Sequence, residues 1–317
     1  MILPKFDYHS PRTLQEAFEI ISNETNFKIL GGGTDLLVDI RSKAIPDELR
    51  IKFQTPNANQ SASKKNLPET LIALSRIPTL KGIYPKGESI RIGAMTPIRE
   101  LIRSKIIQKY LRGIIDGAEQ LGSPLVRNRG TYGGNICNAR PAADTSIPTL
   151  ALSGELVLVS KSGERIIKHN VFVTGPGKTI IRNDEILKEI LIPLPQSDRF
   201  GSSYIKLANR KALEISVVGA ATAIGFAKSK KVESVHIALG AVAPTPLLVE
   251  GVEAILVGKV FTERLAEKAA GYAADYSHPI TDHRGSKEYR KLMVKVLVRR
   301  ALILSFERAF EDGRGKS

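Results

Sequence analysis

The chain has 317 residues, of which 42% are hydrophobic, and this is enough for about two domains with buried cores. Its longest uncharged apolar stretch, residues 215–227, is too short to cross a bilayer, and its first ten residues lack a hydrophobic signal core, so we expect a cytoplasmic protein without a membrane span. The formal charge of +15 keeps nucleic-acid binding as an alternative, although the basic residues are spread along the chain. The single cysteine, Cys137, excludes an internal disulfide and an iron–sulfur centre held by four thiolates of this chain.

The first elements in chain order are a helix, a strand and a run of glycines. Residues 13–22 have a helical pattern, with Thr13 and Glu16 spaced as a capping box. The apolar residues 27–30 predict a strand that leads directly into residues 31–35, Gly-Gly-Gly-Thr-Asp, which we call the first glycine run. The polar residues 50–70 that follow predict a surface loop.

Two strands and two helices are predicted next. The strands cover residues 71–74 and 89–92, and Thr96-Pro97 is expected to open a helix, with Thr96 as its cap and proline in its first position. A longer helix with Leu111, Ile114, Ile115 and Ala118 on one face is expected to end at residues 122–124, Gly-Ser-Pro.

The first half of the chain closes with strands. Residues 155–159 and 165–168 flank Ser162-Gly163 and predict a hairpin, and residues 186–192 predict a strand that Pro193 closes. Residues 194–199 are the best linker candidate, so we place a domain boundary there.

The second half predicts strands followed by helices, which favours a small α+β domain. The expected strands cover residues 203–207, 216–224 and 232–239, and the expected helices cover residues 247–257, 263–273 and 286–308. The apolar stripe of the last helix, which we interpret as packing within a bundle, consists of Tyr289, Leu292, Met293, Val296 and Leu297.

The first glycine run has a counterpart in residues 131–135, Thr-Tyr-Gly-Gly-Asn, the second glycine run. Glycine permits positive φ and close approach, so consecutive backbone amides in either run can converge on an anion such as a pyrophosphate. Thr34 adds a hydroxyl donor and Asp35 an acceptor. Taken alone, each run is equally compatible with a purely structural turn.

Other motifs have no comparable support. Neither glycine run has the spacing of a dinucleotide-binding Rossmann loop or of a P-loop. Residues 175–179, Gly-Pro-Gly-Lys-Thr, also fail the P-loop spacing because Phe172 stands where a glycine is required, so we interpret them as a turn between strands. The histidines are scattered without paired ligand spacing, and we expect no metal site.

A family resemblance rests on residues 28–36 and 129–135, followed by residues 141–144, Pro-Ala-Ala-Asp. With these motifs, the chain resembles the FAD-binding medium subunit of the xanthine dehydrogenase family, whose relatives include the flavoproteins of aerobic carbon monoxide dehydrogenase and of 4-hydroxybenzoyl-CoA reductase. The match continues in order over almost the whole chain, through residues 75–77, 91–94, 172–179, 286–290 and 300–302.

The resemblance implies an α+β fold in two domains. Residues 1–193 would form the two-part FAD-binding domain of the vanillyl-alcohol-oxidase (PCMH) type, and residues 199–310 a smaller α+β domain of the carbon monoxide dehydrogenase flavoprotein type. Residues 51–69 look like an insertion relative to the family.

The resemblance also implies a noncovalently bound FAD whose diphosphate is held by the two glycine runs. Asp144 matches a cofactor contact, Leu187 an apolar backbone contact to the flavin or adenine, and Lys206 a cation near the isoalloxazine. Tyr204 is expected either near the flavin ring or in the core. The expected cofactor-binding residues are Ile29, Leu30, Gly31, Gly32, Gly33, Thr34, Asp35, Leu36, Thr131, Gly133, Gly134, Asn135, Asp144, Leu187 and Lys206.

The function implied is electron transfer within a molybdenum hydroxylase-type oxidoreductase. A large subunit with a molybdenum cofactor and a small subunit with [2Fe–2S] clusters would be the partners, in a dimer of heterotrimers, and the FAD would pass electrons to an external acceptor without a catalytic side chain. The cysteine-bearing insertion of the 4-hydroxybenzoyl-CoA reductase flavoprotein is missing, and the first glycine run has no histidine for a covalent flavin link. A stand-alone flavin oxidoreductase and a basic nucleic-acid-binding module are the alternatives.

Overall fold

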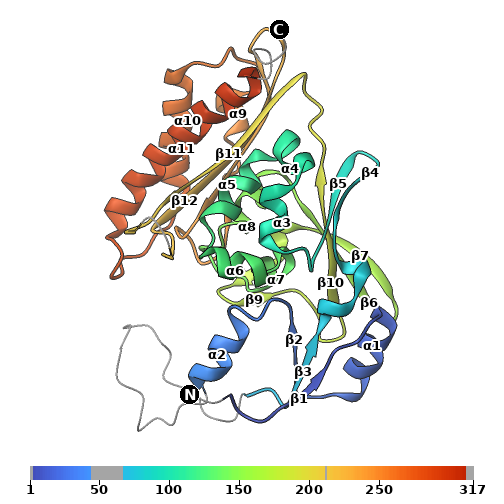
Figure 1. Ribbon diagram of the computed structural model, residues 1–317. Helices are drawn as coiled ribbons and strands as arrows, with labels where there is room; N and C mark the ends of the chain where they lie inside the picture. Colours follow the sequence, from blue (N-terminus) through green and yellow to red (C-terminus); the bar gives the residue numbers. More distant parts are fainter. Residues whose placement is uncertain (1–2, 44–66, 211–212, 312–317) are drawn as a thin grey trace.

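A computed structural model describes residues 3–43, 67–210 and 213–311. Three units follow one another along the molecule: a small N-terminal unit, a central unit rich in short helices, and a C-terminal unit in which long helices cover a sheet (Figure 1). The predicted surface loop at residues 50–70 lies largely outside the described residues. No helix of the described chain is long and apolar enough to cross a membrane.

The N-terminal unit is a parallel sheet of three strands in the order β1-β3-β2, which makes β2 an edge strand. The predicted cap of α1 is confirmed, since the Thr13 side chain accepts a hydrogen bond from the Glu16 amide at 3.1 Å. The buried face of α1, with Ala17, Phe18 and Ile21, belongs to a core that also contains residues of β6 and β10. The elements are β1 (Asp7–His9), α1 (Leu14–Asn23), β2 (Phe27–Leu30), α2 (Leu36–Lys43), β3 (Thr70–Ala73) and the 3-10 helices η3 (Leu74–Arg76) and η4 (Pro78–Leu80).

The central unit contains an antiparallel sheet of five strands in the order β4-β5-β10-β6-β7. The predicted hairpin is confirmed: β6 pairs with β7, and Ser160 is opposite Gly163 at the turn. The interpretation of residues 175–179 as a turn is also confirmed, because β8 pairs with β9 there. The strands are β4 (Ile83–Lys86), β5 (Ser89–Gly93), β6 (Glu155–Ser160), β7 (Gly163–Lys168), β8 (Val173–Gly175), β9 (Lys178–Thr179) and β10 (Ile186–Pro193).

Short helices cover this sheet, and their ends differ from the prediction. Pro97 is the cap residue of α3 rather than its first residue, and the Thr96 hydroxyl instead accepts a hydrogen bond from the Gly82 amide at 3.0 Å. Residues 122–124 do not only end a helix: Ser123 caps α6, and Pro124 is its first residue. The helices are α3 (Ile98–Arg103), α4 (Lys105–Tyr110), α5 (Arg112–Gln120), α6 (Pro124–Arg129), α7 (Tyr132–Cys137), α8 (Ser146–Ala151) and the 3-10 helix η5 (His169–Val171).

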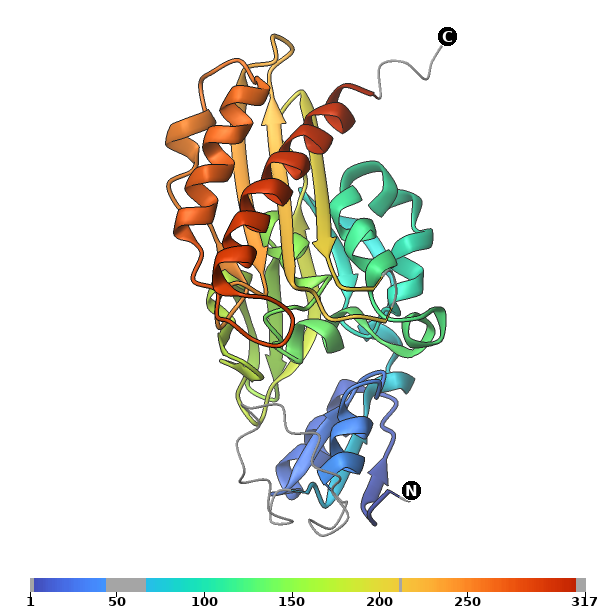
Figure 2. The same ribbon diagram turned by 90° about the vertical axis from the view of Figure 1, so that its left-hand side faces the viewer.

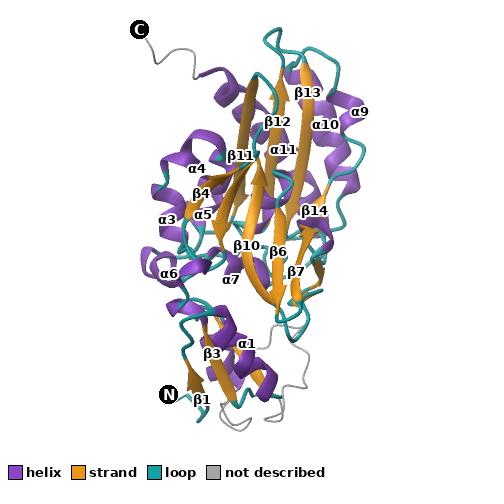
Figure 3. Cartoon of the chain, turned by 90° about the vertical axis from the view of Figure 1, so that its right-hand side faces the viewer, coloured by secondary structure: helices purple, strands orange, loops and turns teal. Residues whose placement is uncertain are grey.

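The C-terminal unit is an antiparallel sheet in the order β11-β12-β13-β14. Helices α10 and α11 lie over one face of this sheet (Figure 2), and α5 and α8 of the central unit pack against its strands as well. Figure 3 shows the long strands of the central and C-terminal sheets from the opposite side. The elements are β11 (Arg199–Leu207), β12 (Val218–Phe226), β13 (Val232–Gly240), β14 (Leu247–Leu248), α9 (Glu253–Leu256), α10 (Glu263–Tyr276) and α11 (Lys287–Glu311).

Two predictions for this unit were wrong in part. The helix expected at residues 247–257 begins with the short strand β14, and its helical part is limited to α9. The expected apolar stripe of the last helix is only partly its packing face, since Leu297 is buried but Tyr289 is 44% and Leu292 is 57% exposed. The face that is buried comprises Arg290, Val294, Leu297, Val298, Ala301, Leu302, Ser305 and Ala309.

Candidate functional site

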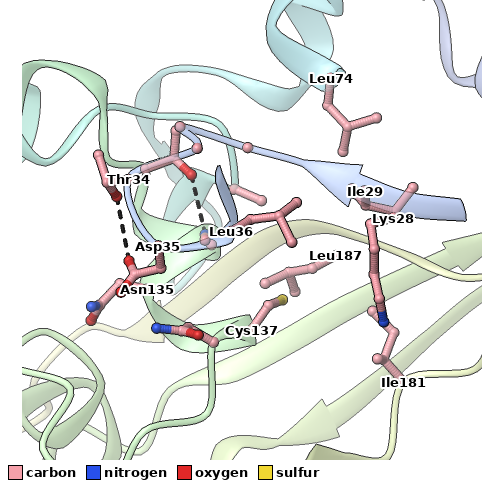
Figure 4. Close-up of a pocket in the computed structure, with 18 of the residues that line it drawn as sticks. Lys28, Ile29, Thr34, Asp35, Leu36, Leu74, Asn135, Cys137, Ile181 and Leu187 are labelled. Carbon is pink, nitrogen blue, oxygen red and sulfur yellow. Dashed lines mark hydrogen bonds between the residues drawn. The ribbon is translucent and has the colours of Figure 1, made fainter. Parts of the chain in front are cut away.

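A cleft of about 740 Å³ opens between the N-terminal and central units. Its walls come from β2, from the loop that joins β2 to α2, from α7 and from the start of β10 (Figure 4). The volume is in the range of pockets that bury small molecules and cofactors. Most of the predicted site residues lie in its wall: Ile29, Gly31, Gly32, Gly33, Thr34, Asp35, Leu36, Thr131, Gly133, Gly134, Asn135 and Leu187.

The first glycine run provides unused hydrogen-bond donors to this cleft. The amides of Gly32, Gly33 and Thr34 are bonded to no acceptor among the described residues. Gly33 has φ +77°, a conformation that strongly favours glycine. Helix α2 starts directly after the run, so its positive dipole end points to the same place. Adjacent amides without a protein partner at a helix start are the arrangement that an anion-binding site requires.

Gly32 is needed for a second reason, which is close packing. A Cβ atom at this position would lie 2.0 Å from the Arg129 carbonyl oxygen and 2.8 Å from the Gly130 Cα. The loop of the N-terminal unit therefore touches the backbone of the central unit just before the second glycine run. This contact brings the two glycine runs to the same cleft.

Thr34 and Asp35 supply the polar side chains of the first run. The Thr34 hydroxyl donates to the Asp35 carboxylate at 3.4 Å (Figure 4). Asp35 is exposed at the edge of the cleft, so its carboxylate has room to accept further hydrogen bonds from hydroxyl groups.

The second glycine run has a different structure from the turn we expected. Thr131 caps the helix α7, and its side chain accepts a hydrogen bond from the Gly134 amide at 3.1 Å. The Gly133 amide donates to the Ala94 carbonyl at 2.8 Å. The protein itself thus uses both glycine amides. A Cβ atom at Gly133 would lie 2.6 Å from that of Ala94, so this glycine serves close packing.

Asn135 remains available for a ligand from the second run. Its side-chain oxygen accepts from the Thr145 hydroxyl at 2.7 Å, which leaves the amide nitrogen of the side chain to face the cleft. Thr145 directly follows Asp144, so this hydrogen bond ties the cleft to the loop that carries Asp144.

Asp144 itself lies outside the cleft wall, in a buried cluster between the central and C-terminal units. We call Asp144, Tyr204, Lys206 and Ser216 the Asp144 cluster. The Asp144 carboxylate accepts from the Tyr204 hydroxyl at 2.8 Å, from Lys206 Nζ at 2.8 Å and from the Ser216 hydroxyl at 3.1 Å. The sequence predicted three of these residues individually but not their contact with one another.

Charge in this cluster is balanced. Burial raises the pKa of Asp144 above its ordinary value, while Lys206, Tyr204 and Ser216 act in the opposite direction. Burial and the charge of Asp144 both raise the pKa of Tyr204, which therefore acts as a neutral hydrogen-bond donor. The side chain of Lys206 is 6% exposed, and it borders a second hollow of about 300 Å³ together with Gln120 and Arg210.

Apolar side chains line the far end of the cleft, where Ile29 and Leu187 face each other with Leu74 and Ile181 (Figure 4). Leu30, which was also predicted to contact the cofactor, is not part of the wall. Lys28 does belong to it, and the sequence did not indicate this. Neighbouring residues of a strand point to opposite faces of the sheet, so alternation would place only one of Lys28 and Ile29 in the cleft. Both line it, and β2 is an edge strand of its sheet.

Cys137 also faces the cleft, with its sulfur between Leu187 and the glycine runs (Figure 4). Burial raises the pKa of its thiol to about 12, so the reactive thiolate is not formed near neutral pH. No group of three or more possible metal-binding side chains occurs among residues 3–43, 67–210 and 213–311. The cleft thus offers binding groups rather than a nucleophile.

Comparisons with known proteins agree with this geometry. A family model described as FAD binding domain in molybdopterin dehydrogenase matches residues 57–195, and one described as CO dehydrogenase flavoprotein C-terminal domain matches residues 203–304. The carbon monoxide dehydrogenase medium chain of Hydrogenophaga pseudoflava is 33% identical over 97% of this chain and 99% of that protein. The xanthine dehydrogenase FAD-binding subunit of Escherichia coli O157:H7 is 29% identical over 93% of this chain and 94% of that protein.

Solved structures show the same relationship. A chain of the carbon monoxide dehydrogenase of Hydrogenophaga pseudoflava matches with a TM-score of 0.85 and 32% identity, covering 98% of this chain and 100% of that chain. A chain of quinoline 2-oxidoreductase from Pseudomonas putida 86 matches with a TM-score of 0.84 at 24% identity, covering 98% of this chain and 99% of that chain, and so shares its fold.

Proposed function

The chain belongs to the family of FAD-binding medium subunits of molybdenum hydroxylase-type dehydrogenases, and we propose that the cleft between its N-terminal and central units holds the FAD diphosphate. The observation that carries this proposal is the set of three consecutive amides, at Gly32, Gly33 and Thr34, that have no acceptor among the described residues and lie just before α2. A diphosphate needs several donors at once, and backbone amides provide them without the cost of ordering long side chains.

The rest of the cleft suits the remainder of the cofactor. Asn135 offers a side-chain donor beside the glycine runs, and the wall at Ile29, Ile181 and Leu187 can pack against an aromatic ring. Asp144 and Lys206 would meet the end of the cofactor nearest the C-terminal unit, and the hydrogen bond from Thr145, next to Asp144, to Asn135 in the cleft wall supports this. We propose the predicted residues of the cleft wall, together with Asp144 and Lys206, as the FAD contacts, and we keep the domain limits 1–193 and 199–310.

FAD, when bound, accepts single electrons and releases pairs, which suits an electron relay. The described side chains hold and orient the cofactor, and none is required to act as an acid or base. We propose that the electrons come from the [2Fe–2S] clusters of a small subunit in a complex with a molybdenum-cofactor large subunit, arranged as a dimer of heterotrimers in the cytoplasm. The medium chains to which this chain is similar carry names of such dehydrogenases, which supports the proposal.

One preparation tests both parts of the proposal. The purified chain should bind about one FAD, and acid precipitation should release that FAD into the supernatant, because no covalent link is expected. Co-expressed with the molybdenum and iron–sulfur chains of its own genome, it should elute with them on gel filtration. A chain that stays colourless after incubation with FAD would contradict flavin binding. A yellow chain that never associates with the other subunits would instead support the stand-alone alternative.

A further inference from the structure

Arg290 is a buried cation in α11 that is not part of the cleft wall but lies close to the Asp144 cluster. It is 3% exposed, and one guanidinium nitrogen, Nη1, donates to the Val217 carbonyl at 3.0 Å and to the Ala241 carbonyl at 2.8 Å. The other, Nη2, donates to the Asp282 carboxylate. Burial of a guanidinium is costly unless it is fully paired and hydrogen-bonded, and Nε of Arg290 has no partner among the described residues, so the burial of this side chain requires an explanation.

Each of these two carbonyl groups is connected to Asp144 through a neighbouring residue and one hydrogen bond. Val217 follows Ser216, whose hydroxyl donates to the Asp144 carboxylate at 3.1 Å. The Ala241 amide donates at 2.9 Å to the carbonyl of Pro141, at the beginning of the loop that carries Asp144. Ala241 has φ +61°, which alanine rarely adopts, so its conformation depends on the contacts that hold it.

We infer that Arg290 is a positioning residue that orients the Asp144 carboxylate toward FAD by holding the backbone at Val217 and Ala241. The inference rests on the proposed role of Asp144 as a cofactor contact. A planar guanidinium suits this task, because it reaches two carbonyl oxygens and one carboxylate in a fixed geometry, which a lysine ammonium does not reproduce. Without Arg290, both carbonyl groups lose their partner, and the hydrogen bond from Ser216 to Asp144 loses its support.

The test compares FAD affinity and flavin midpoint potential in wild type, Asp144→Asn, Arg290→Met and the double variant. We expect Arg290→Met to weaken FAD binding about tenfold, which corresponds to about 1.4 kcal/mol. It should also shift the midpoint potential in the same direction as Asp144→Asn. The double variant should bind FAD no more weakly than the weaker of the two single variants, because both changes act through one carboxylate.

Two further variants keep the result interpretable. Arg299→Met removes another α11 arginine, whose partner Glu263 is exposed, and it should leave both readouts unchanged. Arg290→Lys keeps a cation opposite Asp282, and should fold and recover part of the affinity if Arg290→Met does not fold.

The outcomes separate the two claims. If Arg290→Met and Arg290→Lys match wild type, or if the two effects multiply in the double variant, Arg290 does not act through Asp144. If Asp144→Asn itself binds FAD with unchanged affinity and potential, the proposed role of Asp144 fails, and the inference fails with it.

Discussion

At the scale of single residues, the glycines of the cleft either leave a backbone amide free for a ligand or allow close packing of two backbones. The sequence predicted the first use better than the second. The sequence indicated an anion site at the first glycine run, and the free amides of Gly32 and Gly33 agree with it. The same argument applied to the second run was wrong for the amides of Gly133 and Gly134, which bond to Ala94 and Thr131. A sequence shows that an amide can be exposed, but the partner that occupies it comes from a distant part of the chain.

His169 is a buried residue whose protonation should affect stability rather than function. Its Nε2 lies 3.0 Å from the Ser146 hydroxyl, and its Nδ1 has no partner among the described residues. Burial lowers the pKa of His169 from 6.5 to about 4, so the unfolded chain binds the proton more strongly than the folded chain does. The stabilising effect of the neutral form is therefore complete above about pH 6.5 and is lost as the pH falls toward 4.

The variant His169→Gln removes this titration. We expect the free energy of unfolding of wild type to fall by roughly 3 kcal/mol more than that of the variant between pH 7.5 and pH 4. Urea unfolding at several pH values measures the difference, and the carboxylates that titrate in the same range are common to both proteins. Parallel pH profiles for the two proteins would show that His169 is not buried in its neutral form.

At the scale of elements, the packing of the long helix α11 was hard to predict because the helix has several partners. An amphipathic pattern with one apolar stripe assumes one partner, whereas α11 packs against β11, β12 and α10. Its buried face therefore includes Arg290 and Ser305, which a hydrophobicity pattern does not select. Strands β6, β7 and β10 were predicted well because short apolar runs bounded by turn residues or proline are local signals.

Ion pairs along α11 differ in burial and should differ in energy. Arg308 forms a two-nitrogen pair with Asp116 at 2.6 and 2.9 Å, and its side chain is 13% exposed. Asp116 also accepts from the Tyr204 amide, so this pair joins α5, β11 and α11. By contrast, Arg299 pairs with Glu263 at 2.6 Å, with side chains that are 42% and 72% exposed.

We expect Arg308→Met to lower the free energy of unfolding by about 3 kcal/mol, because it leaves the largely buried Asp116 carboxylate, 16% exposed, without its cation. Arg299→Met, which removes an exposed arginine of the same helix, should cost less than about 1 kcal/mol. Denaturant unfolding of both variants provides the comparison. Equal effects would mean that the Asp116 pair does not join the central and C-terminal units more strongly than a surface contact does.

At the scale of the whole molecule, all three units contribute residues to the proposed site. The N-terminal unit supplies the first glycine run, the central unit supplies α7 and the Asp144 loop, and the C-terminal unit supplies Lys206 and Ser216. The hydrogen bond from Thr145 to Asn135 connects the cleft to the Asp144 cluster. Resemblance to a family identified most of these residues, but no local pattern predicted that segments so far apart in the sequence would meet.

The central claim is that the first glycine run holds the FAD diphosphate, and a pair of glycine variants tests it. Gly33 and Gly258 have nearly equal positive φ values, +77° and +81°. Backbone strain from valine at either position should therefore lower the free energy of unfolding by a similar amount, roughly 1 to 3 kcal/mol. Gly258 is far from the cleft wall, and a Cβ atom there would meet nothing within 4 Å.

The measurement is the FAD content and FAD affinity of purified wild type, Gly33→Val and Gly258→Val. We predict that Gly33→Val loses its flavin, with affinity reduced at least about tenfold, or by about 1.4 kcal/mol, whereas Gly258→Val retains the flavin of wild type. Full flavin retention by a folded Gly33→Val protein would contradict the account.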